Sequence, residues 1–325
     1  MGYRALLGLT SGVLAAVFIA TTFPASDAVA QGGLGPAGRE VIQNLSPAER
    51  RQFFDLSRRQ RRAFIQKRMR EGSGKPKRKA APAPAAEGDL NPNMPRQVQE
   101  RAGLFNTGVT AIYPKGAKCL EVKSFFGDQT RYDGSTRTPM FYQGYHEGFD
   151  ISADEGTPLV ALADGEVVHS FSGRRLVGNQ IYLRHTPEDT GLSVYIYSKY
   201  KHFRDLPDLK VGTRVKIGQL LGYSGKTGTT GGHFGRSGYP HLHLSIYVAP
   251  TGEYKSQKIK VAPKDVRYFD PMALYLMAAH KVTDNHAVRA LPTAAKKVRI
   301  PYKTSGGRIV PEDTRLIWPF LCEGK

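Results

Sequence analysis

The stretch of sequence that decides the fold is HLHLSIYV, residues 241–248, in which apolar residues alternate with histidine and serine and the end is apolar. This pattern predicts a β-strand, and in a strand residues i and i+2 point to the same face of the sheet. His241 and His243 can therefore address one site, while Leu242 faces the core. A His-x-His pair alone is more often structural than functional, so the motif becomes informative only if further ligands join it.

A second group of potential ligands lies earlier in the chain. Residues 146–150, HEGFD, place His146 and Asp150 four positions apart with Gly148 between them. This spacing suits one helical turn or a folded loop, and either would present both side chains to one ion. Zn²⁺ binds imidazole nitrogen and carboxylate oxygen well, and a catalytic site uses three protein ligands and leaves the fourth tetrahedral position open. If the two segments meet in space, the sequence predicts a zinc enzyme.

The region around these motifs, from residue 104 onward, consists of short apolar runs separated by turn residues. Runs of this length and spacing favour an antiparallel β-sheet, and the pair Asp164-Gly165 between two of them predicts a hairpin turn. Residues 271–280 carry apolar side chains at helical spacing and predict a helix. We therefore expect a mainly β fold, an antiparallel sheet domain followed by a helix and a C-terminal tail. The apolar runs are residues 159–163, 166–168, 180–184, 192–197 and 215–222.

The first thirty residues have the features of an export signal. Arg4 supplies a positive charge, residues 5–20 are mostly apolar, and residues 28–30 (AVA) fit the small-x-small cleavage pattern. We expect cleavage after Ala30 and export to the periplasm or cell envelope, or secretion. The alternative is an uncleaved membrane anchor.

Residues 31–103 form a basic segment. Residues 46–49, SPAE, predict a helix start, because Ser caps the helix, Pro occupies the first turn and Glu follows three residues after the cap. We expect one basic helix from there to about Met69, followed by an extended linker over residues 72–95, which are rich in Gly, Lys, Pro and Ala. Two interpretations of the helix stay open: a solvated surface helix, or a helix that lies on an anionic membrane or wall polymer.

Charge and cysteine content restrict the partners. The net charge is +19, and about half of it lies in residues 31–103. A protein this basic is attracted to anionic polymers. Because we expect export, these polymers are cell-wall or lipid phosphates, and we expect no nucleic-acid partner. The chain has two cysteines, Cys119 and Cys322, and in an oxidising compartment we expect them to form an intramolecular disulfide.

Over residues 118–278 the chain resembles the zinc metallopeptidases of the LytM/lysostaphin type, peptidase family M23. Residues 146–150 are similar to the family's first metal motif, and residues 240–243, PHLH, to its closing motif. Residues 200–203, YKHF, are similar to the family's Tyr-x-His-Leu, although the tyrosine-containing run before them is longer than usual. Further matches follow in order along the chain: residues 124–127 (SFFG), 156–158 (GTP), 164–167 (DGEV), 178–179 (GN), 211–222 (VGTRVKIGQLLG) and 225–228 (GKTG).

The resemblance implies a division of roles among the histidines. His146, Asp150 and His243 would bind one catalytic Zn²⁺, His241 would act as general base, and His202 would donate to the oxyanion or assist proton transfer. The implied activity is that of an exported zinc metalloendopeptidase in which zinc-bound water attacks the scissile carbonyl of peptide cross-links in peptidoglycan. The alternative is a non-catalytic relative that activates a cell-wall amidase, which the intact ligand set disfavours.

The expected organisation therefore has four parts. These are a signal peptide over residues 1–30, a basic helical segment and linker over 31–103, an M23-like zinc peptidase domain over 104–281, and a tail over 282–325 packed on that domain. Residues Thr229 to Phe234 exceed the glycine-rich segment usual in the family and predict an insertion at the edge of the groove.

Overall fold

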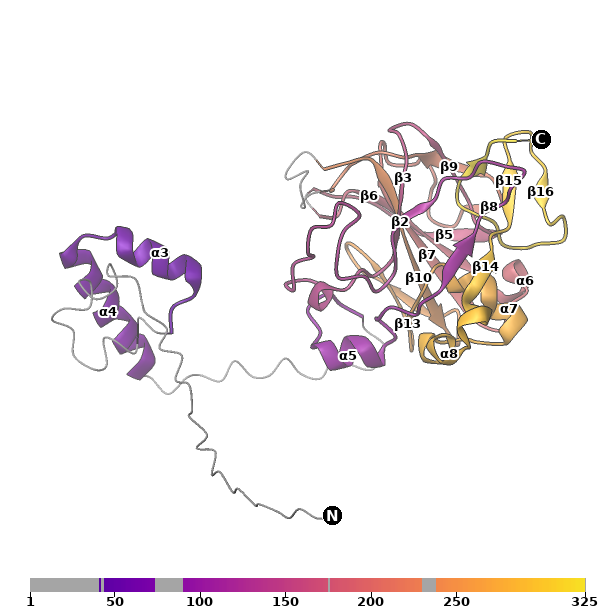
Figure 1. The fold of residues 1–325 in the computed structure, drawn as a ribbon. Coiled ribbons are helices and arrows are strands. Elements are labelled where there is room, and N and C mark those ends of the chain that lie inside the picture. Colours follow the sequence, from indigo (N-terminus) through magenta and orange to yellow (C-terminus); the bar gives the residue numbers. More distant parts are fainter. Residues whose placement is uncertain (1–40, 42–43, 74–89, 175, 230–237, 325) are drawn as a thin grey trace, which may run out of the picture. The chain divides into compact units, whose positions relative to one another are not determined.

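The computed structural model describes residues 41, 44–73, 90–174, 176–229 and 238–324 (Figure 1). The expected signal peptide and almost all of the expected insertion lie outside these residues. The chain divides into two compact units, Met1–Pro82 and Ala83–Lys325. Of the helices that the structure describes, none is both long enough and apolar enough to span a bilayer.

The described part of the first unit contains two helices, α3 (Pro47–Asp55) and α4 (Arg58–Ser73). α3 begins where the sequence predicts a helix start. The backbone N–H of Glu49 donates to Ser46 Oγ (3.3 Å), and the backbone N–H of Ser46 donates to the Glu49 carboxylate (3.0 Å). This capping box satisfies backbone donors that have no partner within the helix.

The prediction of one continuous helix over residues 47–69 is wrong, because a second capping box interrupts it. Ser57 N–H donates to Gln60 Oε1 (2.9 Å), and Gln60 N–H donates to Ser57 Oγ (3.5 Å), so a new helix starts at this serine. The break allows α3 and α4 to bury Phe53 and Ile65 in one small core.

The described part of the second unit is built on an eight-stranded sheet whose neighbouring strands are all antiparallel (Figure 1). The strand order is β2-β3-β10-β7-β6-β5-β8, and β13 also pairs with β10. This arrangement confirms the predicted mainly β, antiparallel fold class. The strands are β2 (Val122–Ser124), β3 (Phe149–Ser152), β5 (Gly165–Ser172), β6 (Asn179–His185), β7 (Tyr195–Phe203), β8 (Arg214–Val215), β10 (His241–Ala249) and β13 (Arg267–Phe269).

Strand β10 lies inside the sheet and is buried along its whole length. Its residues alternate between two faces, as the sequence pattern predicts. Leu242 and Leu244 join the main hydrophobic core, which the C-terminal region covers with Trp318. His241 and His243 point to the opposite face, where they line a pocket.

Shorter elements surround the main sheet. The predicted helix over residues 271–280 is present as a 3₁₀ turn, η3 (Ala273–Leu276), followed by α7 (Met277–His280). The other helical elements are α5 (Arg96–Arg101), η1 (Tyr142–Gly144), α6 (Pro187–Thr190), α8 (Asn285–Ala290) and η4 (Thr293–Lys296). The small sheets contain β1 (Thr110–Ile112), β4 (Pro158–Val160), β9 (Leu220–Tyr223), β11 (Tyr254–Ser256), β12 (Val261–Pro263), β14 (Lys297–Arg299), β15 (Tyr302–Thr304), β16 (Ile309–Val310) and β17 (Leu321–Cys322).

The predicted hairpin at Asp164-Gly165 is wrong. The preceding strand, β4, pairs with β9, whereas the following strand, β5, pairs with β6 and β8. The Asp164 carboxylate instead accepts hydrogen bonds from the backbone N–H of Ile217 (2.7 Å) and from Lys216 Nζ (2.9 Å). The side chain thereby ties this turn to the segment between β8 and β9, so the two strands beside the turn belong to different sheets.

The C-terminal tail lies against the start of the sheet domain. Cys119 and Cys322 form the predicted disulfide. Next to it, Lys118 and Glu323 exchange two backbone hydrogen bonds of 2.7 and 2.9 Å. Trp318 is fully buried, and its indole N–H donates to the backbone carbonyl of Leu120 (2.9 Å).

Residues 90–103, which we expected at the end of a linker, lie on the second unit. The Gln99 side chain of α5 is fully buried and donates to the Asn91 carbonyl O (3.0 Å). Met94 packs in a cluster with tyrosines of the sheet, and Lys260 Nζ donates to the Leu90 carbonyl O (2.7 Å). The apolar residues in this stretch, rather than its composition as a whole, therefore decide where the folded unit begins.

Candidate metal centre

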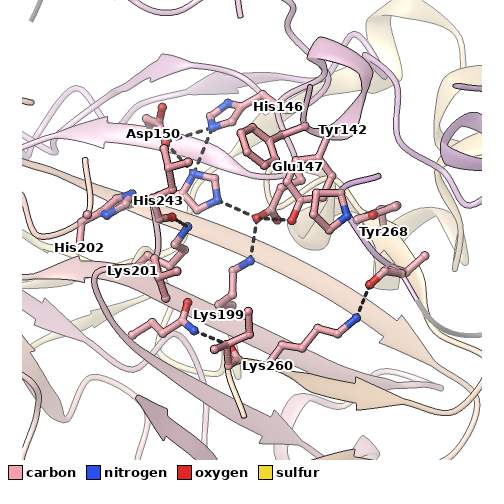
Figure 2. Close-up of a pocket in the computed structure, with 18 of the residues that line it drawn as sticks. Tyr142, His146, Glu147, Asp150, Lys199, Lys201, His202, His243, Lys260 and Tyr268 are labelled. Atoms are coloured by element: carbon pink, nitrogen blue, oxygen red, sulfur yellow. Dashed lines mark hydrogen bonds and ion pairs between the residues drawn. The ribbon is translucent and has the colours of Figure 1, made fainter. Parts of the chain in front are cut away.

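The three residues predicted as zinc ligands converge at one point of the sheet (Figure 2). Asp150 on β3 lies directly opposite His243 on β10, and His146 lies in the loop that enters β3. Asp150 Oδ1 is 2.9 Å from His243 Nδ1 and 3.1 Å from His146 Nε2, and the two nitrogens are 3.1 Å apart. One ion could therefore contact all three side chains.

The donor atoms fit a zinc ion. Ligand atoms about 2.0–2.1 Å from a tetrahedral ion lie roughly 3.3 Å from one another, close to the separations found here. The remote nitrogen of each imidazole has its own partner: His146 Nδ1 donates to the Phe125 carbonyl O (3.0 Å), and His243 Nε2 donates to Ser245 Oγ (3.1 Å) and faces Glu147 Oε1 (3.4 Å). These contacts favour a proton on each remote nitrogen, which leaves the nitrogens that face Asp150 available to a metal.

The glycine of the HEGFD motif is needed for close packing. A Cβ atom at Gly148 would lie 2.3 Å from the Leu244 carbonyl O and 3.0 Å from His243 Nε2. Because no side chain fits between this loop and β10, glycine lets His146 and Asp150 approach the third ligand.

His241 and His202, predicted to line the reacting centre, both lie beside the cluster. His241 Nδ1 donates to the Tyr239 carbonyl O (2.9 Å) and His202 Nδ1 to the Thr227 carbonyl O (2.6 Å), so each ring keeps an unprotonated Nε2. The ring centroids are 4.7 Å apart, and His241 Nε2 is 3.6 Å from Asp150 Oδ1. Burial lowers the pKa of both imidazoles, which are therefore neutral proton acceptors at pH 7.

A buried ion pair lies next to the three predicted ligands, and the sequence analysis did not predict it. Lys199 Nζ lies 2.7 Å from Glu147 Oε1 and donates to Tyr247 Oη (2.9 Å), which in turn donates to Glu147 Oε2 (3.1 Å). Burial opposes ionisation of the carboxyl, but Lys199 holds the pKa of Glu147 well below its usual range. The ionised carboxylate faces His243 Nε2, so it can orient this ligand. The sequence signal for this ion pair was Glu147, the charged residue directly after His146 in the HEGFD motif.

Asp150 has a second set of partners at its other oxygen. Arg137 Nη2 lies 3.3 Å from Asp150 Oδ2 and donates to Ser124 Oγ (2.8 Å), and the Tyr239 hydroxyl donates to Oδ2 (3.5 Å). Burial opposes ionisation of Asp150, but the imidazoles around it hold its pKa well below the usual range. The carboxylate is therefore held in its charged form, and Arg137 and Tyr239 orient it. No motif in the sequence pointed to Arg137 or Tyr239.

The cluster lies in a cavity of about 830 Å³. One wall is formed by residues around Arg137 and Phe141, and the floor by β6, β7 and β10. Lys201 of β7 lies on the floor next to the cluster (Figure 2). Burial, followed by the neighbouring charge of Lys199, lowers the pKa of Lys201 to about 8.

Comparison with known proteins shows which family this region matches. Residues 144–259 match the model of peptidase family M23. The peptidoglycan DD-endopeptidase ShyC of Vibrio cholerae is 36% identical over 119 residues, which cover 37% of this chain and 23% of that protein. The glycyl-glycine endopeptidase ALE-1 of Staphylococcus capitis is 37% identical over 101 residues, which cover 31% of this chain and 24% of that protein.

A third relative is named for a different role. The murein hydrolase activator NlpD of Salmonella typhimurium is 34% identical over 88 residues, which cover 27% of this chain and 21% of that protein. The chain thus spans less than a quarter of the length of each of these three relatives. The family match nevertheless contains all five predicted site residues, so residues 144–259 form a peptidase family M23 domain within this chain.

Proposed function

We propose that this protein is an exported zinc metalloendopeptidase that hydrolyses peptide cross-links of peptidoglycan. The observation that carries the proposal is the His146, Asp150 and His243 cluster, which lies in an open groove beside two neutral histidines. The names of two relatives, a peptidoglycan DD-endopeptidase and a glycyl-glycine endopeptidase, support the substrate class. The Cys119–Cys322 disulfide fits an oxidising compartment.

The residues of the cluster would hold the zinc ion, and three protein ligands leave the fourth tetrahedral position open. When bound, zinc supplies a water whose pKa is near neutrality and polarises a carbonyl group. The Tyr239 carbonyl accepts the proton of His241 Nδ1, so the Nε2 atom of the same ring is the one that can accept a proton. His241 Nε2 would take up a proton near the cluster and return it to the leaving amine.

The sequence left two roles open for His202, namely donation to an oxyanion and assistance in proton transfer. Its Nδ1–H donates to the Thr227 carbonyl O, so the neutral ring offers a lone pair rather than a proton at Nε2. This state suits assistance in proton transfer, next to His241, better than donation to an oxyanion. Arg137 and Glu147 would keep the ligands in place through Asp150 and His243.

Zinc content and digestion of purified peptidoglycan test this function on the full chain. His243→Ala should lose both zinc and cleavage. His241→Ala should keep zinc and lose about 10²–10⁴ in rate, as expected for a general base. Complete digestion by zinc-free His243→Ala protein would refute the proposal, and loss of zinc in His241→Ala would exchange the two roles.

A second candidate function is activation of a cell-wall amidase, which the relative named as a murein hydrolase activator favours. A regulator of this kind does not need an intact zinc site. The same His243→Ala protein separates the candidates: if it still stimulates a purified amidase and the unmodified protein cleaves no cross-link, regulation is the function. The complete ligand set argues for the peptidase.

A further inference from the structure

One lateral row of the sheet leads from the metal cluster into the groove. In the strand registers, Asp150 of β3 lies opposite His243 of β10, which lies opposite Lys201 of β7, which lies opposite Gln180 of β6. All four residues line the cavity. Because neighbouring strands are about 4.8 Å apart, Lys201 stands one strand away from a predicted ligand. Figure 2 shows it on the floor of the pocket beside Lys199.

The charge of Lys201 is not balanced within this groove. Its ammonium donates to the Leu176 carbonyl O (3.2 Å), and no acidic side chain in the described part of the chain forms an ion pair with it. The two acidic side chains that line the groove already have cationic partners, at 2.7 and 3.3 Å. A half-buried charge without a counter-charge is costly, and a carboxylate is the partner that satisfies an ammonium best.

We propose that Lys201 is a specificity-determining residue that binds a free carboxylate of the peptide substrate next to the scissile bond. The proposal rests on the peptidase function above. An extended peptide advances about 3.3 Å per residue, so a carboxylate on a residue flanking the scissile bond reaches a position one strand from the metal cluster. The substrate class is therefore an acidic cross-link peptide whose carboxylates are free rather than amidated. A bridge built only of glycine offers no carboxylate at this position.

The test uses the zinc-loaded full chain and pairs of cross-linked peptides that differ only in whether one carboxylate beside the scissile bond is free or amidated. One pair is made for each side of the bond. The readout is the ratio of kcat/KM for the free and the amidated peptide. The unmodified protein should favour the free carboxylate by about 10–100-fold in one of the pairs, as expected for a hydrogen bond between charged groups.

Substitutions assign this preference to one side chain. Lys201→Met should bring the ratio close to one, and Lys201→Arg should keep most of the preference, because a guanidinium also binds carboxylates. Lys255→Met is the matched control, since it removes the same charge from an exposed position on β11 that does not line the cavity. It should leave the ratio as in the unmodified protein.

Two outcomes overturn the proposal. If Lys201→Met leaves the ratio unchanged, even with a lower rate on both peptides, Lys201 acts on the reacting carbonyl or on the fold and does not read the carboxylate. If the zinc-loaded protein cleaves neither peptide, the peptidase function fails, and calorimetric affinities for the same peptides then test Lys201 alone. A preference for the free carboxylate that Lys201→Met removes supports the proposal, and equal affinities overturn it.

Discussion

The ion pair between Glu147 and Lys199 offers a quantitative test of how the site is supported. Both side chains are nearly inaccessible, at 5% and 6% exposure, and the charged atoms are 2.7 Å apart. Lys199→Met removes the ammonium and leaves the Glu147 carboxylate buried with hydroxyl partners from Tyr142 and Tyr247. Neutral hydroxyls do not replace a counter-charge, so the carboxylate must either stay charged at a high cost or take up a proton.

The expected loss follows from this burial. Removing one partner of a buried ion pair costs about 3–5 kcal/mol, because the remaining charge is uncompensated. In Glu147→Gln with Lys199→Met both charges disappear, so the double variant should lose about 1–3 kcal/mol less than the sum of the two single losses. Glu147→Gln should also weaken zinc binding by about 10–100-fold, since Glu147 Oε1 lies 3.4 Å from His243 Nε2.

Urea unfolding of the metal-free protein at pH 7 measures these free energies. Trp318, the single tryptophan of the chain, is fully buried in the second unit and reports unfolding by its fluorescence. The exposed pair Lys264 and Glu253, 3.4 Å apart, is the matched control, and its coupling should stay below about 1 kcal/mol. A loss below about 1 kcal/mol for Lys199→Met, or strictly additive losses for the two sites, would refute the reasoning.

Three further predictions address other parts of the chain. Replacing both Cys119 and Cys322 by alanine should lower the free energy of unfolding by up to about 5 kcal/mol, since the disulfide closes a loop with a sequence separation of 203; urea unfolding that matches the unmodified protein would contradict this. Burial raises the pKa of Asp270 to about 6, so the folded state retains a proton that the unfolded state loses, and this group's contribution to stability falls as the pH rises from about 4 to about 6. Asp270→Asn should remove up to about 3 kcal/mol of that decline, and parallel pH profiles of urea unfolding for the two proteins would show that Asp270 is not its source. Deleting residues 36–71 should weaken binding to anionic vesicles or wall polymer more at low salt than at high salt, because salt screens exposed charges; equal binding of both proteins in a low-salt sedimentation assay would exclude this role.

The parts of the fold that the sequence predicted are those set by local patterns. Alternation in residues 241–248 places two histidines on one face and leucines on the other, because side chains in a strand alternate with a period of two. The cap at Ser46 was predictable for the same reason, since a capping box needs only residues three apart. The second capping box, formed by Ser57 and Gln60, has the same spacing. It was not predicted because the basic residues on both sides of it look like one continuous helix.

The parts that the sequence did not predict depend on pairing between distant segments. Asp164 bonds to Ile217 rather than closing a local hairpin, and Lys199 meets Glu147 only because β7 and the loop before β3 both lie beside β10. Lys201 and His202 are consecutive and would face opposite sides of a regular strand, yet both line the cavity. A φ of 68° at His202 ends the regular alternation, and no residue pattern signals this conformation.

The contrast between His241 and His243 shows why residue identity alone does not define a role. The two rings lie on the same face of β10, two positions apart. His243 presents Nδ1 to the cluster because Ser245 and Glu147 occupy its Nε2 side, whereas His241 presents Nε2 because the Tyr239 carbonyl accepts from its Nδ1. A strand pattern can therefore bring two imidazoles to one site, but the partners of their remote nitrogens select which nitrogen each ring offers to an ion or a proton.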